Sequence, residues 1–296
     1  MRKYSLNEHW LDNLDCEEKF YFLRFFAADG CNHGNYLEVK LKSDDRKILE
    51  KMASWFEYNG PLYESVQKIE GADKIGHYVS LSIHSSYLCN RLTELGLPPR
   101  KTFSLRFPVY ISNENMRHYI RGYFDGDGSI TVRRTQTTLS PSAEFCGASA
   151  FLWDLNAIIY QKFGFSLNFR VVPRVGGDCF QAKFGKAENA FVILDWMYAD
   201  CAVFLDRKYS RYKELREYRN KHPENKAERA KRLASQKDQI IQDRMSGMSS
   251  KNLSKKYDCS ESYLFKLFNE NKVYVYKTKL NENKEDIHYA ISCRNR

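Results

Sequence analysis

Two stretches, "FLRFFAADG" at residues 22–30 and "IRGYFDGDG" at residues 120–128, decide how this chain folds. Each is a helical, aromatic-rich segment that ends on an aspartate followed by glycine, Asp29 in the first and Asp127 in the second. The C-terminal end of a helix carries the negative end of its dipole and favours cations. A carboxylate at both helix ends therefore requires a physical explanation.

The residues that follow the two aspartates repeat one pattern. After Asp29 the pattern predicts, in order, a strand, a helix, two strands and a helix, at residues 36–42, 43–56, 63–69, 77–85 and 86–97. After Asp127 it predicts two strands, a helix, two strands and one or two further helices, at residues 129–138, 143–149, 150–164, 167–174, 179–185 and 188–219. The second half therefore has the order αββαββα. We interpret the first half as the same repeat, although only one strand is predicted there before its second helix, so the chain is an α+β protein with halves at residues 1–112 and 113–220.

The predicted strands alternate apolar and polar side chains, so one face of each sheet should be buried and the other exposed. In the strand at residues 36–42, Leu37, Val39 and Leu41 lie on one face. The other face is polar and partly basic. Its candidate DNA contacts are Lys40 and Lys42 in the first half, and Arg133, Arg170, Arg174 and Lys183 in the second. A solvated face would explain any one of these residues, but two matched sheets with paired acids favour a groove that holds nucleic acid.

The helix at residues 20–28 is apolar almost all round, so it should be buried. A lone carboxylate at its buried C-terminal end would lie among unpaired carbonyls. A divalent cation removes this conflict, because Mg²⁺ prefers oxygen ligands and also bridges phosphate oxygens. If the two motif helices pack side by side, two such sites lie close together, one for each strand of a duplex. An isolated Asp-Gly pair is more typical of a turn.

The composition sets the class of partner. The chain of 296 residues has a net charge of +10, and residues 221–296 hold 17 Lys and Arg against 10 Asp and Glu. This basic segment favours nucleic acid or another acidic surface as the partner. The eight cysteines form no C-x-x-C pair, so we expect reduced thiols and an intracellular, cytoplasmic protein. No apolar run of about 18 residues is present, so we expect no membrane association.

The two motifs resemble the signature helices of the LAGLIDADG homing endonucleases, in the single-chain form that carries two motifs. The segments "LGLPPRKTFSLRFP" and "LDWMYADCAVFLDRKY" also resemble recurrent segments of that family, and the resemblance covers roughly residues 16–215. It implies two halves with saddle-shaped antiparallel sheets, a monomer that forms a pseudo-dimer, and two motif helices packed at the pseudo-twofold axis.

The resemblance also implies the chemistry of the site. Asp29 and Asp127 would each bind Mg²⁺ at a scissile phosphate, with two or more ions in all and Mn²⁺ able to substitute. The carbonyls of Ala28 and Gly126 would be further ligands. The family's loop lysines correspond to Lys101 and Lys208, which gives the catalytic set Asp29, Asp127, Lys101 and Lys208.

Two of the positions at which the motifs differ bear on the packing and on the site. The family usually has Gly or Ala at the third position, where the backbones approach; Gly122 fits but Arg24 does not. Arg24 should push the helices apart or reach past Gly122 to a carboxylate. Asp125 has no acidic counterpart in the first half, and we interpret it as a capping or structural group.

The C-terminal segment predicts a separate module. Residues 221–234 are charged and nearly free of large apolar residues, which indicates a linker or an exposed helical spacer. Ser235 and Asp238 form a helix-start pattern. Residues 235–270 then predict a small all-α helix-turn-helix domain, whose second helix at residues 261–269 would place Ser262, Tyr263 and Lys266 in the major groove. Residues 271–296 predict a strand or an extended arm.

Together these features predict a site-specific DNA endonuclease of a mobile intron or free-standing element. It would cut both strands of a long, nearly palindromic target with a divalent metal, leaving short 3′ overhangs as the family does. Two alternatives remain open: a DNA-binding transcription regulator that has lost the nuclease, and a splicing maturase that binds intron RNA. Retention of both carboxylates argues against the first alternative.

Overall fold

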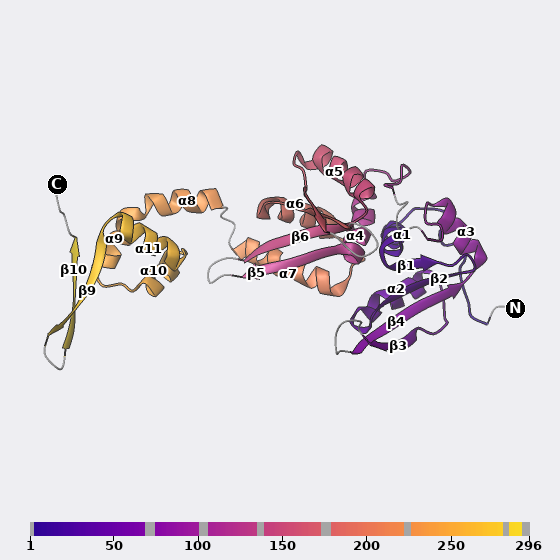
Figure 1. Cartoon of the computed structure of the whole chain (residues 1–296), viewed down its shortest axis with the longest axis horizontal. Helices are drawn as coiled ribbons and strands as arrows, with labels where there is room; N and C mark the ends of the chain where they lie inside the picture. Colours follow the sequence, from indigo (N-terminus) through magenta and orange to yellow (C-terminus); the bar gives the residue numbers. More distant parts are fainter. Residues whose placement is uncertain are drawn as a thin grey trace. The chain divides into compact units, whose positions relative to one another are not determined.

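The computed structural model describes residues 3–68, 75–100, 106–134, 139–172, 179–221, 226–280 and 284–291. The chain divides into two compact units, one of residues 1–132 and 140–216 and the other of residues 133–139 and 217–296. The first unit contains the first predicted half and most of the second, except residues 133–139 and 217–220 (Figure 1). Within the described residues, no helix is both long and apolar enough to cross a lipid bilayer.

The two halves have the predicted order of elements. The first half consists of α1 (Glu17–Asp29), β1 (Gly30–Asn32), β2 (Tyr36–Lys42), the 3-10 helix η1 (Ser43–Asp45), α2 (Arg46–Trp55), β3 (Tyr63–Lys68), β4 (Ile75–His84) and α3 (Ser86–Glu94). The second consists of α4 (Met116–Asp127), β5 (Gly128–Arg134), β6 (Leu139–Gly147), α5 (Ser149–Phe163), β7 (Asn168–Val172), β8 (Cys179–Lys183) and α6 (Ala187–Tyr198), and α7 (Asp206–Lys221) follows. The predicted αββαββα repeat is confirmed.

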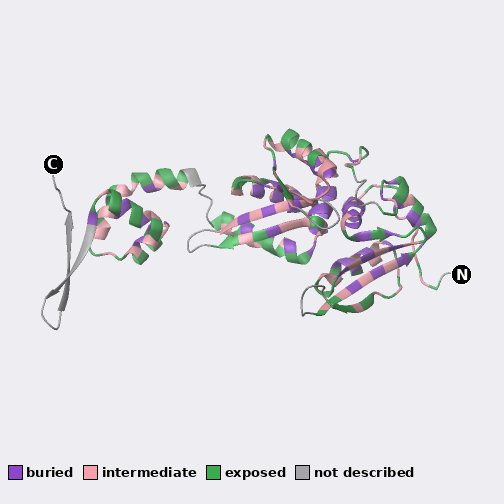
Figure 2. Cartoon of the chain, viewed as in Figure 1, coloured by how far each residue is buried: buried purple, intermediate pink, exposed green. Residues whose placement is uncertain are grey.

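Each half builds its own four-stranded sheet, and the two sheets have the same strand order. The strand orders are β1-β2-β4-β3 and β5-β6-β8-β7, with antiparallel neighbours. Along β2 and β4 buried and partly exposed residues alternate, visible as bands in Figure 2. Helices α2 and α3 pack against the first sheet and α5 against the second, so the apolar strand faces point into a helical layer (Figure 1).

In the first half, the helix predicted at residues 43–56 starts later than expected, and Ser43 is not the N-cap that its position suggests. It begins η1, and α2 starts at Arg46 with Asp45 at the capping position and no side-chain cap. The short 3-10 turn moves the helix start by three residues, and Asp45 at its end contacts Arg207 of α7, as described below.

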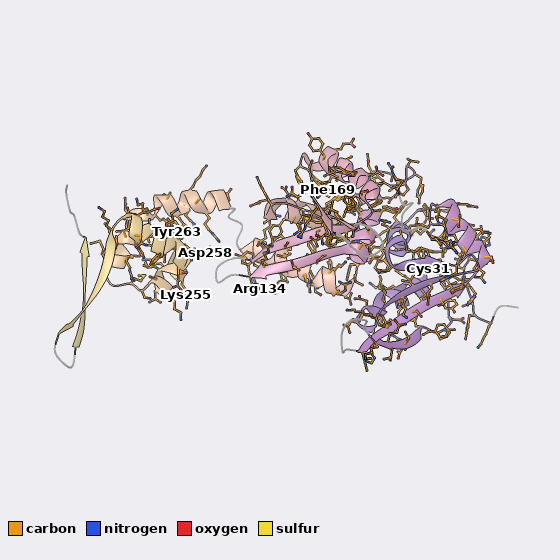
Figure 3. The ribbon with its side chains drawn as sticks, in the orientation of Figure 1. Cys31, Arg134, Phe169, Lys255, Asp258 and Tyr263 are labelled. Atoms are coloured by element: carbon orange, nitrogen blue, oxygen red, sulfur yellow. The ribbon has the colours of Figure 1, made fainter. Side chains whose placement is uncertain are left out.

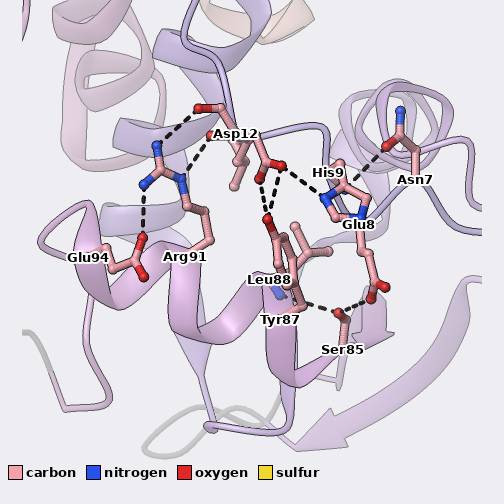
Figure 4. A network of polar contacts seen from close by, with 10 residues as sticks. Asn7, Glu8, His9, Asp12, Ser85, Tyr87, Leu88, Arg91 and Glu94 are labelled. Atoms are coloured by element: carbon pink, nitrogen blue, oxygen red, sulfur yellow. Dashed lines mark hydrogen bonds and ion pairs between the residues drawn. The ribbon is translucent and has the colours of Figure 1, made fainter.

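The N-terminal segment is held on α3 by polar contacts (Figure 4). The Tyr87 hydroxyl donates to both carboxylate oxygens of Asp12 at 2.9 Å, and Arg91 donates to the carbonyls of Leu11 and Asp12 at 3.1 Å. Ser85 caps α3 by accepting from the Leu88 amide at 3.2 Å. These bonds fix the segment that leads into α1.

The second unit has its own apolar core. It contains α8 (Lys226–Ser235), α9 (Lys237–Met245), α10 (Ser250–Lys256), α11 (Glu261–Glu270) and the antiparallel hairpin of β9 (Val273–Leu280) and β10 (Lys284–Ile291). Its buried residues are Leu233, Ile240, Leu253, Tyr257, Cys259, Leu264, Leu267, Phe268 and Val273. The segment predicted as a linker therefore ends in a helix that contributes Leu233 to this core, and the C-terminal arm contains a hairpin.

The predicted helix start at Ser235 is wrong. Ser235 is the last residue of α8, where its hydroxyl donates back to the Arg232 carbonyl at 2.8 Å. Helix α9 starts at Lys237 after Gln236, which makes no side-chain cap. A serine hydroxyl can satisfy a carbonyl of the preceding turn as well as an amide of the next one, so the pattern alone does not distinguish the two.

Candidate active site at the paired helix ends

Helices α1 and α4 are in direct backbone contact. A Cβ atom at Gly122 would lie 2.3 Å from the Tyr21 carbonyl oxygen and 3.1 Å from the Phe25 amide nitrogen. Real Cβ atoms do not approach other heavy atoms so closely, so only glycine permits this crossing. The helices pack side by side as the predicted metal site requires.

The contact continues to the C-terminal ends of both helices. A Cβ atom at Gly126 would lie 2.4 Å from the Ala28 Cβ and 3.2 Å from Oδ2 of Asp29. The carboxylate of the first motif therefore lies beside the last turn of the second. Asp29 and Asp127 are the final residues of their helices, and both keep solvent-exposed surface.

The two carboxylates influence each other electrostatically. The pKa of Asp29 is raised to about 6, first by loss of solvation at the helix junction and second by the negative charge of Asp127. The positive charges of Lys208 and Arg207 act in the opposite direction. Asp29 is thus a partly desolvated carboxylate that a nearby cation would stabilise in its ionised form.

Lys208 caps the end of α4 from inside the protein. Its side chain is 2% exposed, and its ammonium donates to the carbonyls of Phe124 at 2.5 Å, Asp125 at 2.7 Å and Gly128 at 2.6 Å, with Gly126 farther away at 3.4 Å. Burial lowers the pKa of Lys208 to about 8, and the negative charge of Asp125 opposes that shift. A cation at this position satisfies the unpaired carbonyls and offsets the helix dipole. This placement favours a role for Lys208 in positioning the end of α4 over the catalytic role predicted for it.

Asp125 is the buried centre of a hydrogen-bond network, as its structural interpretation requires. Its carboxylate accepts hydrogen bonds from the Tyr21 hydroxyl at 2.9 Å, the Tyr198 hydroxyl at 2.5 Å and the Leu205 amide at 2.8 Å. These donors come from α1, α6 and the segment before α7. Burial raises the pKa of Asp125. The network fixes α4 against its three neighbours just before the Gly126–Asp127 end.

A second buried polar group was not predicted from the sequence. Arg121 is fully buried and donates to the carbonyls of Val203 at 2.7 Å and Met197 at 2.8 Å, and it forms an ion pair with Glu17. Glu17 also accepts from the amides of Ala202 and Val203, each at 3.0 Å. This pair connects the first turn of α1 to the loop between α6 and α7.

Arg24 does not reach a carboxylate, so that prediction is wrong. Its guanidinium carbon lies 4.0 Å from the ring centroid of Tyr123 and 3.8 Å from that of Phe151. The side chain is 2% exposed, and its Nε and Nη1 atoms have no hydrogen-bond partner among the described residues. Arg24 reaches sideways past Gly122 and stacks on aromatic rings, which leaves the helix contact intact.

Arg207 is a basic residue that acts electrostatically on Asp29 and was not predicted from the sequence. Its Nε donates to Asp45 at 3.1 and 3.2 Å, and its positive charge helps to lower the pKa of Asp29. Arg207 precedes Lys208 in the "LDRKY" segment, of which only Lys208 was predicted to belong to the site. Its side chain is 52% exposed, which leaves it accessible to a phosphate. Lys101, the other predicted lysine, lies outside the described residues.

The paired helix ends could hold a divalent cation. The donors predicted for it, the carboxylates of Asp29 and Asp127 and the carbonyls of Ala28 and Gly126, are all oxygen atoms, which Mg²⁺ prefers. The Gly126 carbonyl also lies 3.4 Å from the Lys208 ammonium. Within the described part of the chain, no group of three or more His, Cys, Asp or Glu side chains could hold a metal ion. The remaining ligands of a cation here would thus be water and phosphate, which is typical of Mg²⁺.

The exposed face of the first sheet is more hydroxyl-rich than basic. Lys42 is exposed, while Lys40 is half-buried with its ammonium 5.3 Å from the ring centroid of Tyr78. The strand register places on the same face Cys31, Tyr36, Glu38, Tyr63, Ser65, Gln67, Tyr78, Ser80, Ser82 and His84. Cys31 on β1 is exposed two residues after Asp29 (Figure 3). This face offers many neutral donors and acceptors along with its two lysines.

The second sheet places its basic residues on the exposed face. Arg133 on β5 and Arg170 on β7 are exposed. Lys183 on β8 is half-buried, with its ammonium 3.8 Å from the Glu144 carboxylate on β6. The fourth predicted contact, Arg174, lies outside the described residues. The predicted basic character is therefore present at Arg133 and Arg170 and partly neutralised at Lys183.

In the second unit, α10 and α11 are joined by a four-residue turn at residues 257–260. Asp258 has a φ of +44°, and the Ser260 hydroxyl caps α11 by accepting from the Tyr263 amide at 3.1 Å. Two short helices joined by a tight turn are thus present where the sequence predicts a helix-turn-helix, and the DNA-binding role of that motif stays a prediction. Ser262 and Lys266 are exposed as predicted.

Tyr263, predicted to enter the major groove, does not project into solvent from α11. It is half-buried against the core of its unit, and its hydroxyl lies 3.5 Å from the Leu233 carbonyl (Figure 3). The turn of α11 that places Leu264 and Leu267 in the core carries Tyr263 to the edge of that core. Its role as a DNA contact is therefore not supported by its position.

No family model matches the sequence, and no curated protein matches it. The chain is similar to solved structures of LAGLIDADG proteins. The meganuclease I-CpaMI bound to uncleaved DNA is 11% identical, covering 67% of this chain and 89% of that chain at a TM-score of 0.41. The homing endonuclease I-GzeII in complex with its DNA target is 13% identical, covering 73% and 91% at 0.39. The N-terminal LAGLIDADG domain of DUF199/WhiA is 14% identical, covering 66% and 90% at 0.38.

Proposed function

We propose that this chain is a site-specific, divalent-metal-dependent DNA endonuclease of the LAGLIDADG type, which cuts both strands of its target. The observation that carries the proposal is the meeting of the two helix ends. Glycine contacts at positions 122 and 126 bring Asp29 beside the final turn of α4, and the charge of Asp127 contributes to the raised pKa of Asp29. Two carboxylates held this closely are costly unless a cation lies between them.

Asp29 and Asp127, with the carbonyls of Ala28 and Gly126, would hold the metal. A bound Mg²⁺ supplies an activated water and neutralises charge on the scissile phosphate. The protein groups around it have separate tasks. Lys208 fixes the Gly126–Asp127 end, and Arg207 offers an accessible positive charge beside Asp29.

The two sheet faces would bind the duplex on either side of this centre. The first would contact DNA through Lys40, Lys42 and its hydroxyl groups, and the second through Arg133, Arg170 and Lys183. Phosphate contacts position a protein on DNA, while neutral donors and acceptors distinguish base edges. The helix-turn-helix would extend the contact and direct the nuclease to its site.

The test is incubation of the full chain with a random-sequence duplex library and Mg²⁺, followed by sequencing of the cut ends. We expect one long consensus cut on both strands, with cutting lost in EDTA and restored by Mn²⁺. Selective binding without cutting would instead indicate a regulator. Tight binding to a folded intron RNA, with no cut DNA, would indicate a splicing role.

A further inference from the structure

The exposed face of α11 carries a large apolar side chain in an otherwise polar row. Ser262, Phe265, Lys266 and Asn269 are all exposed and follow the spacing i, i+3, i+4 and i+7 of one helical face. Phe265 is 70% exposed. Among residues 228–273, the part of the second unit whose side-chain burial is described, it is the only large apolar side chain that is exposed.

Phe265 is not needed by the core of its own unit. The opposite face of α11 supplies Leu264, Leu267 and Phe268, which are at most 6% exposed, and Tyr263 packs at the edge. A single exposed apolar residue is common on protein surfaces, so exposure alone does not show that Phe265 has a partner. Its place in the centre of a polar row makes it available for a contact outside the unit.

The chemistry of the row matches base edges in the major groove. A phenyl ring makes apolar contact with the 5-methyl group of thymine, and an Asn amide can bond adenine at N6 and N7 in a bidentate manner. Ser and Lys side chains bond base edges or phosphates. Phe265 and Asn269 are one helical turn apart, so they can contact neighbouring base pairs.

Charge on the helix-turn-helix favours a polyanion as the occupant of this face. Residues 237–272 hold seven Lys and Arg against five Asp and Glu. Lys251 and Lys255 on α10 are exposed, whereas the negative charges on α11 lie at its two ends, at Glu261 and Glu270. Glu270 lies 3.7 Å from Lys266 in a pair exposed at both partners, which a phosphate could readily replace.

We propose that α11 recognises an A·T-containing half-site, with Phe265 against a thymine methyl group and Asn269 on an adenine. This inference rests on the proposed function only in that the bound polymer is duplex DNA. It assigns the preference for thymine to Phe265 and that for adenine to Asn269, and it gives Tyr263 no contact with the bases.

The test is selection of binding sites by the full chain in EDTA, where no cutting occurs, from a random duplex pool. Wild type, Phe265→Ala and Asn269→Ala are compared, with Tyr263→Phe as the matched control. Wild type should select one thymine that Phe265→Ala no longer selects. It should also select one adenine that Asn269→Ala no longer selects. The rest of the consensus should remain, and Tyr263→Phe should select the wild-type site.

Replacing the selected thymine by deoxyuridine then removes only the methyl group. The affinity of wild type should fall about fourfold, the value of one buried methyl group, and that of Phe265→Ala should not change. An equal response of both proteins would overturn the proposal. So would an unchanged consensus for Phe265→Ala together with a lower unfolding temperature, because Phe265 would then pack within the protein. If wild type selects no site at all, the proposed function fails with it.

Discussion

Replacement of Lys208 by methionine tests whether this lysine positions the active site or takes part in the reaction directly. Methionine has a similar length and fills the buried space, but it donates no hydrogen bonds. Three carbonyls within 2.5–2.7 Å of the ammonium would lose their partner. An unsatisfied buried polar group costs about 1–3 kcal/mol, and removing one partner of a buried charged network costs about 3–5 kcal/mol in total. We therefore expect a loss of roughly 3–5 kcal/mol in the free energy of unfolding.

For a unit of this size that loss corresponds to a fall of roughly 6–20 °C in unfolding temperature. The assay is thermal unfolding followed by near-UV circular dichroism, together with cleavage of a duplex labelled differently on each strand. Because Lys208 holds the end of α4 and not that of α1, the strand assigned to Asp127 should be cut more slowly than the other, and nicked product should accumulate. Lys213→Met, on the exposed side of α7, is the matched control.

Unchanged stability with equal loss of cutting on both strands would refute the positioning role and support direct participation of Lys208. Unchanged stability and unchanged cutting would refute both roles.

Three further variants test the packing around the paired helices, each by chemical denaturation of the full chain. Gly122→Ala should destabilise the protein by about 1–3 kcal/mol and reduce cutting, because its Cβ would overlap the Tyr21 carbonyl; a wild-type midpoint would contradict the close helix contact. Arg24→Met should leave stability equal or increase it, because the buried guanidinium has two nitrogens without a hydrogen-bond partner among the described residues, and a large loss would show that its ring contacts outweigh its desolvation. The pKa of His118 is lowered to about 4 by burial and by Arg121. Its contribution to stability is therefore intact above pH 6.5 and is lost as the pH falls from 6.5 towards 4. His118→Gln should reduce the loss of stability between pH 7 and 4 by roughly 1–3 kcal/mol, and an unchanged pH profile would exclude His118 as a cause of that loss.

The sequence predicted the features that depend on local periodicity. The alternation in "YLEVKLK" identified the buried face of β2, and the apolar "FYFLRFFA" segment identified the buried helix α1. The glycine at position 122 correctly indicated the close backbone contact, because no other residue permits it.

The roles of long basic side chains could not be predicted in the same way. A lysine in a charged helix usually faces solvent, and nothing in "LDRKY" shows that α7 passes under the end of α4 and buries Lys208. Arg24 posed the same problem, since its aromatic partners Tyr123 and Phe151 are about 100 residues or more away in sequence. Such contacts depend on tertiary packing.

Helix α11 shows a misplaced side chain that its sequence could have revealed. Leu264, Leu267 and Phe268 define the buried face of α11, and Phe265 lies opposite them while Tyr263 lies at their edge. The helical phase of these three residues was a sufficient signal to prefer Phe265 over Tyr263 as an exposed aromatic residue.

The most direct test of the central claim is double-strand cutting by Asp29→Asn and Asp127→Asn on the duplex that wild type selects, with Mg²⁺ present. Asp44→Asn, an exposed aspartate in the first half, is the control. A carboxylate pair that holds the metal predicts that each helix-end variant still binds the duplex but makes no double-strand break, while Asp44→Asn cuts as wild type does. Wild-type rates of double-strand cutting in both helix-end variants would contradict the claim.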